Sequence, residues 1–189
     1  MSFFELPAPR PSSDYRRPAW LRPPEGTLPG IVPLDLLLTR TDTHAVLVSN
    51  LLVYPTGFDF DVAVRLRPGR PRQHHEHDYD YVWDDDLRLE IRFADGRTAS
   101  NDRRRQPRTL ETEEPDPPLL FQSSGGGSGS GDGWQFHLWL WGLPPPGPLA
   151  FACEWPAQQL PPSRAELDAG LVLEAAERAR TLWPAEAPP

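Results

Sequence analysis

The stretch "FDFDVAVRLR" (residues 58–67) decides the fold class, because it alternates cleanly between apolar and charged side chains. Successive side chains of a β-strand point to opposite faces of the sheet, so this stretch has one dry face and one wet face. The apolar residues are Phe58, Phe60, Val62, Val64 and Leu66, and the charged ones are Asp59, Asp61, Arg65 and Arg67. A strand with one wet face favours an antiparallel sheet.

Further strand patterns surround this stretch on both sides. Turn signals separate several of them, at Tyr54–Gly57 and at Asp95–Gly96, and Pro33 predicts that its strand lies at a sheet edge. We therefore predict a mainly β protein: an antiparallel β-sandwich of immunoglobulin-like architecture, with seven to eight strands and one C-terminal α-helix. The expected strands cover residues 31–40, 44–54, 58–67, 87–93, 97–101, 118–122, 134–141 and 149–155.

The domain organisation follows from the same patterns. We expect an irregular proline-rich arm over 1–28, a sandwich over 29–162, a helix over 163–183 packed on the sandwich, and a tail over 184–189. Ser163 and Glu166 have the spacing of a capping box at the start of this helix, and Asp168 offers a second, later start. The sandwich would carry long loops over 68–85, 101–117 and 123–133.

The last third of the chain has a distinctive pattern. The strand "PLAFACEWP" (148–156) precedes a capped helix that ends in "LWP" (182–184). In this it resembles uncharacterised β-sandwich proteins of high-GC Gram-positive bacteria, and the resemblance implies no activity.

Composition narrows the possible functions. The 189 residues include 19 basic residues, all arginine, against 27 acidic ones, so the net charge is −8. This balance argues against binding to nucleic acid or to an anionic membrane. There is no secretory signal pattern and no apolar run of the roughly 20 residues that span a bilayer, so we expect a cytoplasmic protein. Cys153, the single cysteine, is expected to be a small buried hydrophobe.

A His/Asp-rich loop over residues 74–86 is the main candidate for chemistry. Its possible metal ligands are His74, His75, His77 and Asp78. Imidazoles and carboxylates bind zinc or nickel, but HExxH and paired CxxC spacings are missing, which favours a solvated loop and no cofactor. A small hydrolase or metal-dependent enzyme using this loop is the alternative function.

The strand "WQFHLWLW" (134–141) carries large side chains on both faces, so its second face needs a cover. We expect the C-terminal helix to cover Trp139 and Trp141; the N-terminal arm is another possible cover. A third possibility is that these indoles form an exposed platform for a protein partner. The favoured function is accordingly a non-catalytic interaction or accessory protein of unknown role, which binds an unknown protein partner through loops or an aromatic sheet face. The oligomeric state is left open.

Overall fold

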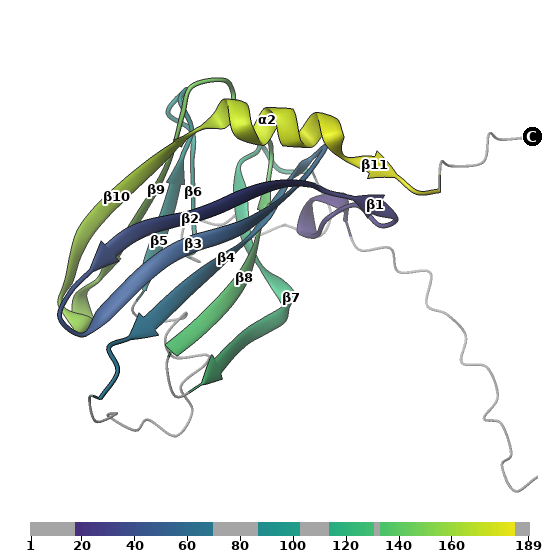
Figure 1. Ribbon diagram of the computed structural model, residues 1–189. Helices are drawn as coiled ribbons and strands as arrows, with labels where there is room; N and C mark the ends of the chain where they lie inside the picture. The colour runs from purple at the N-terminus through teal and green to yellow at the C-terminus, as the bar shows by residue number, and fades with distance from the viewer. Residues whose placement is uncertain (1–17, 70–86, 103–113, 131–132, 184–189) are drawn as a thin grey trace, which may run out of the picture.

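The structure is a computed structural model that describes residues 18–69, 87–102, 114–130 and 133–183. It confirms the antiparallel β-sandwich, whose two layers face each other in Figure 1. The larger sheet has the strand order β2 (Gly30–Arg40), β3 (His44–Tyr54), β4 (Gly57–Leu66), β8 (Gly133–Trp141) and β7 (Leu119–Ser130). The smaller sheet has the order β10 (Leu160–Asp168), β9 (Pro148–Trp155), β5 (Arg88–Arg92) and β6 (Thr98–Ser100).

The alternation in residues 58–67 is reproduced in β4. Phe58, Phe60, Val62 and Val64 are buried between the two sheets. The ring of Phe60 meets that of Phe151 from the smaller sheet edge to face, with centroids 5.6 Å apart. Asp59 and Asp61 consequently lie on the outer face of the larger sheet.

The turns and the sheet edge are where the sequence predicts them. Residues 54–57 join β3 to β4, and the Asp95–Gly96 turn joins β5 to β6, with Gly96 at φ +87°. Strand β2, which contains Pro33, is an edge strand. The likeness to immunoglobulin domains stays a prediction.

The described residues form nine sandwich strands, more than the expected seven to eight, because residues expected to begin the helix form an additional strand, β10. The single-turn 3₁₀ helix η4 (Pro156–Gln158) ends at Gln159 in a left-handed conformation, and the chain returns antiparallel to β9. Ser163 and Glu166 therefore lie in a strand and do not form a capping box. The helix α2 spans only Ala169–Arg178 and starts at the later cap, since the Asp168 side chain accepts a hydrogen bond from Gly170 N at 2.9 Å.

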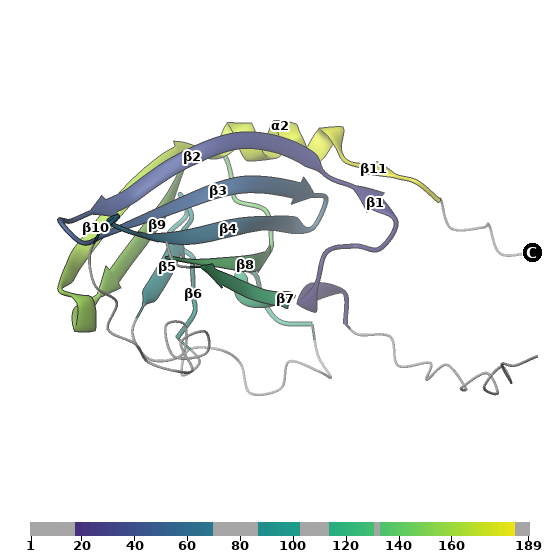
Figure 2. The ribbon, with the colours of Figure 1, turned by 60° about the horizontal axis from the view of Figure 1, so that its bottom comes forward.

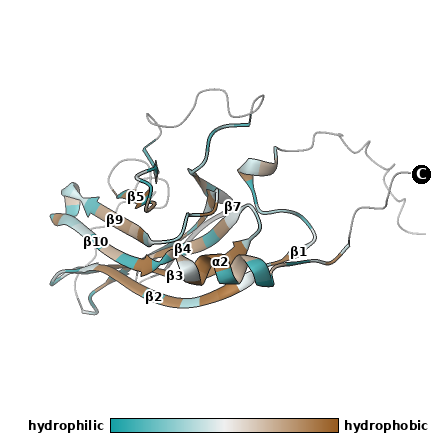
Figure 3. Ribbon diagram, turned by 90° about the horizontal axis from the view of Figure 1, so that it is seen from above, coloured by the Kyte–Doolittle hydropathy of each residue, from teal (hydrophilic) through white to brown (hydrophobic). Residues whose placement is uncertain are grey.

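Helix α2 does not cover Trp139 and Trp141, so that expectation is wrong. It lies over one end of the sandwich, against β2, β3 and β10 (Figure 1), and inserts Ala169, Val172 and Ala175 into the core between the sheets. Its ribbon alternates between apolar and polar residues in Figure 3, as expected of a helix with one buried stripe. Because α2 continues directly from β10, it stays at the edge of the smaller sheet. None of the helices in the described ranges is long and apolar enough to span a bilayer.

Two segments expected to be irregular form strands. The glycine- and serine-rich residues of the expected loop 123–133 largely extend β7, which pairs with β8 after a register shift between Gln122 and Gly127.

Within the expected arm 1–28, residues 19–21 form the single-turn helix η1 (Ala19–Leu21), and β1 (Thr27–Leu28) pairs with β11 (Arg180–Thr181). The ribbon of β1 and β11 extends beyond the sandwich in both Figure 1 and Figure 2.

Candidate interaction surface

The outer face of the larger sheet carries an aromatic cluster made by Tyr54, Trp139 and Trp141. Trp139 is completely buried and Trp141 is 8% exposed. Tyr54 meets Trp139 edge to face at 5.8 Å between ring centroids. The partly buried residues packed around them are Trp20, Leu52, Leu119 and Phe121. Trp139 and Trp141 are therefore covered and do not form an exposed platform.

The N-terminal arm supplies the cover. Helix η1 lies against β8, and the indole N–H of Trp139 donates a hydrogen bond to the main-chain oxygen of Trp20 at 2.9 Å. Of the possible covers, the arm is the one that the structure shows. The aromatic residues 20 and 139 are 119 positions apart, so no local pattern could reveal this contact.

Two polar groups of the cluster are notable. The Nε1 atom of Trp141 is buried and has no hydrogen-bond partner. Burial raises the pKa of Tyr54, and the negative charge of Asp59 raises it further, so the phenol stays protonated at neutral pH. The cluster thus combines apolar rings with hydrogen-bond donors.

A polar network lies beside the aromatic cluster and centres on Asp61, which is 8% exposed. Its Oδ2 accepts hydrogen bonds from Asn50 Nδ2 at 2.8 Å and from Gln135 Nε2 at 3.1 Å. Its Oδ1 contacts Nδ1 of the half-exposed His137. Arg65 in turn donates to Gln135 Oε1 at 3.3 Å. The network links three adjacent strands, β3, β4 and β8.

Asn50 reaches Asp61 because the chain bulges there. Ser49 and Leu52 pair with Asp61 and Asp59, so two residues of β3 oppose one of β4. Asn50 has φ +57°, a left-handed conformation that asparagine tolerates better than most residues. Sequence reasoning missed this residue, although a lone asparagine inside an apolar strand was a usable signal.

No known protein family, curated protein or solved structure matches this chain. The resemblance of the last third to proteins of high-GC Gram-positive bacteria therefore stays a prediction.

The predicted metal ligands His74, His75, His77 and Asp78 lie outside the described residues. Within the described ranges, no three His, Cys, Asp or Glu side chains come together in a group that could hold a metal ion. The alternative function as a hydrolase or metal-dependent enzyme thus depends on residues whose positions the structure does not describe.

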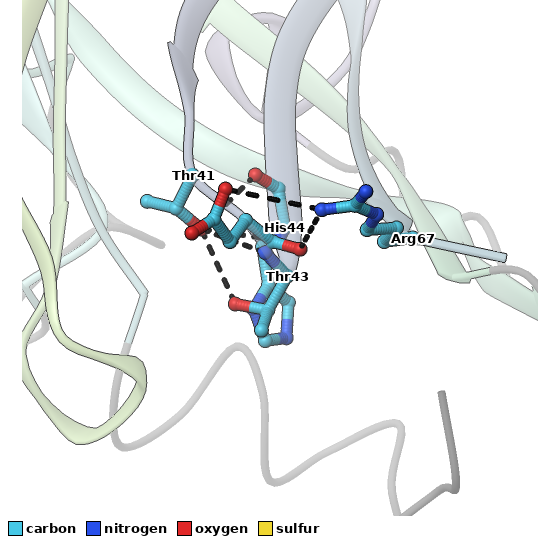
Figure 4. Close-up of polar contacts among 5 residues, drawn as sticks. Thr41, Thr43, His44 and Arg67 are labelled. Carbon is cyan, nitrogen blue, oxygen red and sulfur yellow. Dashed lines mark hydrogen bonds and ion pairs between the residues drawn. The ribbon is translucent and has the colours of Figure 1, made fainter. Parts of the chain in front are cut away.

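His44 and Cys153 are both partly enclosed by packed side chains. Figure 4 shows His44 in a tight network at the β2–β3 turn, where its Nδ1 lies 2.8 Å from Thr43 Oγ1. The imidazole also packs on the ring of Trp155 at 5.7 Å, and burial lowers its pKa. Burial raises the pKa of Cys153 to about 11, as expected of a thiol that acts as a small hydrophobe.

Proposed function

We propose that this chain is a non-catalytic interaction protein that binds a protein partner through the aromatic cluster on its larger sheet. The single observation that carries the proposal is the hydrogen bond from Trp139 Nε1 to the main-chain oxygen of Trp20. Through it the sheet already holds a short peptide segment by its backbone. The cytoplasmic location and the exclusion of nucleic acid, both expected from the sequence, belong to the same proposal.

The bound segment indicates the class of ligand. Its residues, Pro-Ala-Trp-Leu (18–21), are followed by Arg22, Pro23 and Pro24. Pro18 has φ −49° and ψ 142°, close to the polyproline II conformation, and Trp20, whose carbonyl accepts the hydrogen bond, lies in the 3₁₀ turn η1. Aromatic side chains with N–H donors suit segments flanked by proline, because proline limits the conformations of the free segment and leaves neighbouring carbonyls available to the donors. We therefore propose a partner segment with a tryptophan flanked by prolines.

The chain's own residues 18–21 compete with any partner segment for the aromatic cluster. This competition must be weakened before binding of a partner segment can be measured. In the native chain, residues 18–21 occupy the surface at an effective concentration on the order of millimolar. Trp20→Ala in the full-length chain removes the competing indole and leaves the sheet intact. The experiment titrates a dye-labelled peptide of residues 18–24 into this variant and follows fluorescence anisotropy.

We expect saturable binding to Trp20→Ala and at least tenfold weaker binding to the native chain. Leu171→Ala, which removes an exposed apolar side chain from α2, is the control and should behave like the native chain. A labelled peptide with alanine in place of its tryptophan should not bind. If Trp20→Ala is folded by circular dichroism and still takes no peptide, the proposed function is wrong. Adding Trp139→Phe to Trp20→Ala should weaken peptide binding again, since it removes the N–H donor.

A further inference from the structure

The segment that covers the aromatic cluster is tied closely to the β1–β11 ribbon. Only residues 22–25 separate η1 from Gly26, whose main-chain oxygen accepts a hydrogen bond from Leu182 N at 2.7 Å. Two of these four residues are proline, and Arg22 forms an ion pair with Glu25 at 2.7 Å. A link so short, and restricted by proline, holds η1 near the ribbon (Figure 2). The ribbon therefore limits where residues 18–21 can dock.

The ribbon is anchored to the sandwich on both of its strands. Only Ala179 separates β11 from α2, and Arg178 at the end of this helix donates to Ile31 O at 3.1 Å. The other strand, β1, is joined to β2 by Pro29 alone. A pair of two-residue strands is not stable by itself, so the ribbon depends on the contacts at its ends.

The contacts at the open end of the ribbon involve Gly26. A Cβ at this residue would lie 3.1 Å from the ring of Trp183, so the ring packs closely on the glycine backbone. Gly26 also has φ +66°, a conformation natural for glycine. Together with the hydrogen bond from Leu182 N, these features join the N-terminal segment to the residues that follow α2.

Separation of the ribbon would lengthen the link to η1. The first fixed residue would become Gly30, whose backbone packs against Ala175 O, and the free link would grow from residues 22–25 to residues 22–29. Doubling the length of a flexible link lowers the effective concentration of the docked segment about threefold. Pairing of the ribbon and docking of residues 18–21 consequently favour each other, and the coupling is reciprocal.

We propose that the β1–β11 ribbon regulates access to the aromatic cluster. While the ribbon is paired, residues 18–21 stay docked and exclude a partner segment. When β1 and β11 separate, residues 18–21 dock less tightly and the partner segment binds in their place. This inference rests on the proposed function, because it concerns the same site, and it adds the element that opens that site.

A substitution outside the sandwich tests the regulation in the full-length chain. Leu182→Pro removes the N–H that donates to Gly26 O, and Leu182→Ala is the matched control, because it keeps this N–H. Both variants retain Trp20, and both receive the dye-labelled peptide of residues 18–24. We expect Leu182→Pro to bind the peptide at least threefold more tightly than the native chain, though no more tightly than Trp20→Ala. Leu182→Ala should bind it like the native chain.

A variant on the opposite strand provides an independent test. Gly26→Val is strained at φ +66° and brings a side chain against the ring of Trp183, so it should also separate the ribbon. Circular dichroism checks that Gly26→Val and both Leu182 variants are folded. We expect Gly26→Val to bind the peptide as tightly as Leu182→Pro does.

Hydrogen exchange of the Trp139 indole N–H measures docking without any peptide. Nuclear magnetic resonance of the chain labelled with ¹⁵N-tryptophan follows this proton, and its signal is assigned by its loss in Trp139→Phe. The hydrogen bond to Trp20 O protects the proton while residues 18–21 are docked. We expect faster exchange in Leu182→Pro and Gly26→Val than in the native chain and Leu182→Ala.

The two proposals fail separately. If the peptide binds Trp20→Ala, but Leu182→Pro and Gly26→Val bind it no better than the native chain and exchange at Trp139 is unchanged, only the regulation is wrong. Equal tightening by Leu182→Ala would also overturn the regulation, because that variant keeps the hydrogen bond to Gly26. If no variant binds the peptide, Trp20→Ala included, the proposed function fails and the regulation fails with it.

Discussion

Gly30 of β2 lies directly against the main-chain oxygen of Ala175 in α2. A Cβ atom at residue 30 would lie 1.9 Å from that oxygen and 2.6 Å from the carbonyl carbon. Because the obstacle is backbone, no side-chain rotation can relieve it. The absence of a side chain at this position therefore allows the helix to approach the edge strand and complete the core.

Replacing Gly30 by alanine should displace α2 from β2. We expect the free energy of unfolding to fall by about 1–3 kcal/mol, the usual cost of overpacking, as measured by urea denaturation. Glu177→Ala, on the exposed side of the same helix, should change it by less than about 0.5 kcal/mol. Equal stability of Gly30→Ala and the native chain would mean that the helix is not held this closely.

The position of α2 predicts a sharp contrast between two adjacent residues. Val172 is completely buried in the core, whereas Leu171 is 47% exposed. Val172→Ala should lower the unfolding free energy by about 1.5–3 kcal/mol, and Leu171→Ala by less than about 0.5 kcal/mol. Thermal denaturation of both variants checks this, and a larger loss at Leu171 would place the wrong face of the helix against the sandwich.

The contribution of residue 50 to stability should depend on its backbone conformation as much as on its hydrogen bond to Asp61. Asn50→Gly removes the hydrogen bond but accepts φ +57°, whereas Asn50→Ala loses the bond and is also strained. We expect the glycine variant to be more stable than the alanine variant by about 1 kcal/mol. Chemical denaturation of the pair measures the difference, and the reverse order would argue against the left-handed bulge.

The thiol of Cys153 should make stability depend on alkaline pH. Its folded pKa is about 11 against an ordinary value of 9.0, so between these values the unfolded chain releases the proton and the folded chain retains it. The free energy of unfolding therefore keeps its full value below about pH 9 and falls as the pH rises toward 11, by up to about 2–3 kcal/mol. Unfolding free energies of the native chain and Cys153→Ala, measured from pH 8 to 11, should converge by that amount. Parallel curves would show that the thiol does not contribute.

The sequence predicts the parts of this fold that repeat with period 2. Alternation assigns Phe60 to the core and Asp61 to the outer face, because a one-residue error would reverse every side chain of β4. It could not predict where the helix begins: Ser163 and Glu166 match a local capping pattern, yet pairing with β9 decides their conformation. Composition likewise misled at residues 123–130, because strand pairing uses the main chain, which glycine and serine also possess.

The candidate site was less predictable for a related reason. The sequence shows that Trp139 requires a cover, but the choice of Trp20 depends on a contact between distant parts of the chain. Asp61 was expected to be solvated, but Gln135 and His137 of β8 contact its carboxylate, and the bulge at Asn50 adds a third partner. Long-range pairing and irregular backbone are what a local pattern does not encode.

The β1–β11 ribbon also determines how the chain would respond to mechanical force. Thr27 pairs with Thr181 and Leu28 with Arg180, so the segments before Gly26 and after Leu182 leave the ribbon from the same end. A load applied between Gly26 and Leu182 would break the backbone hydrogen bonds one after another instead of shearing them together. The ribbon would therefore separate at a lower force than the sandwich needs to unfold, so the core would remain folded while the ribbon is extended.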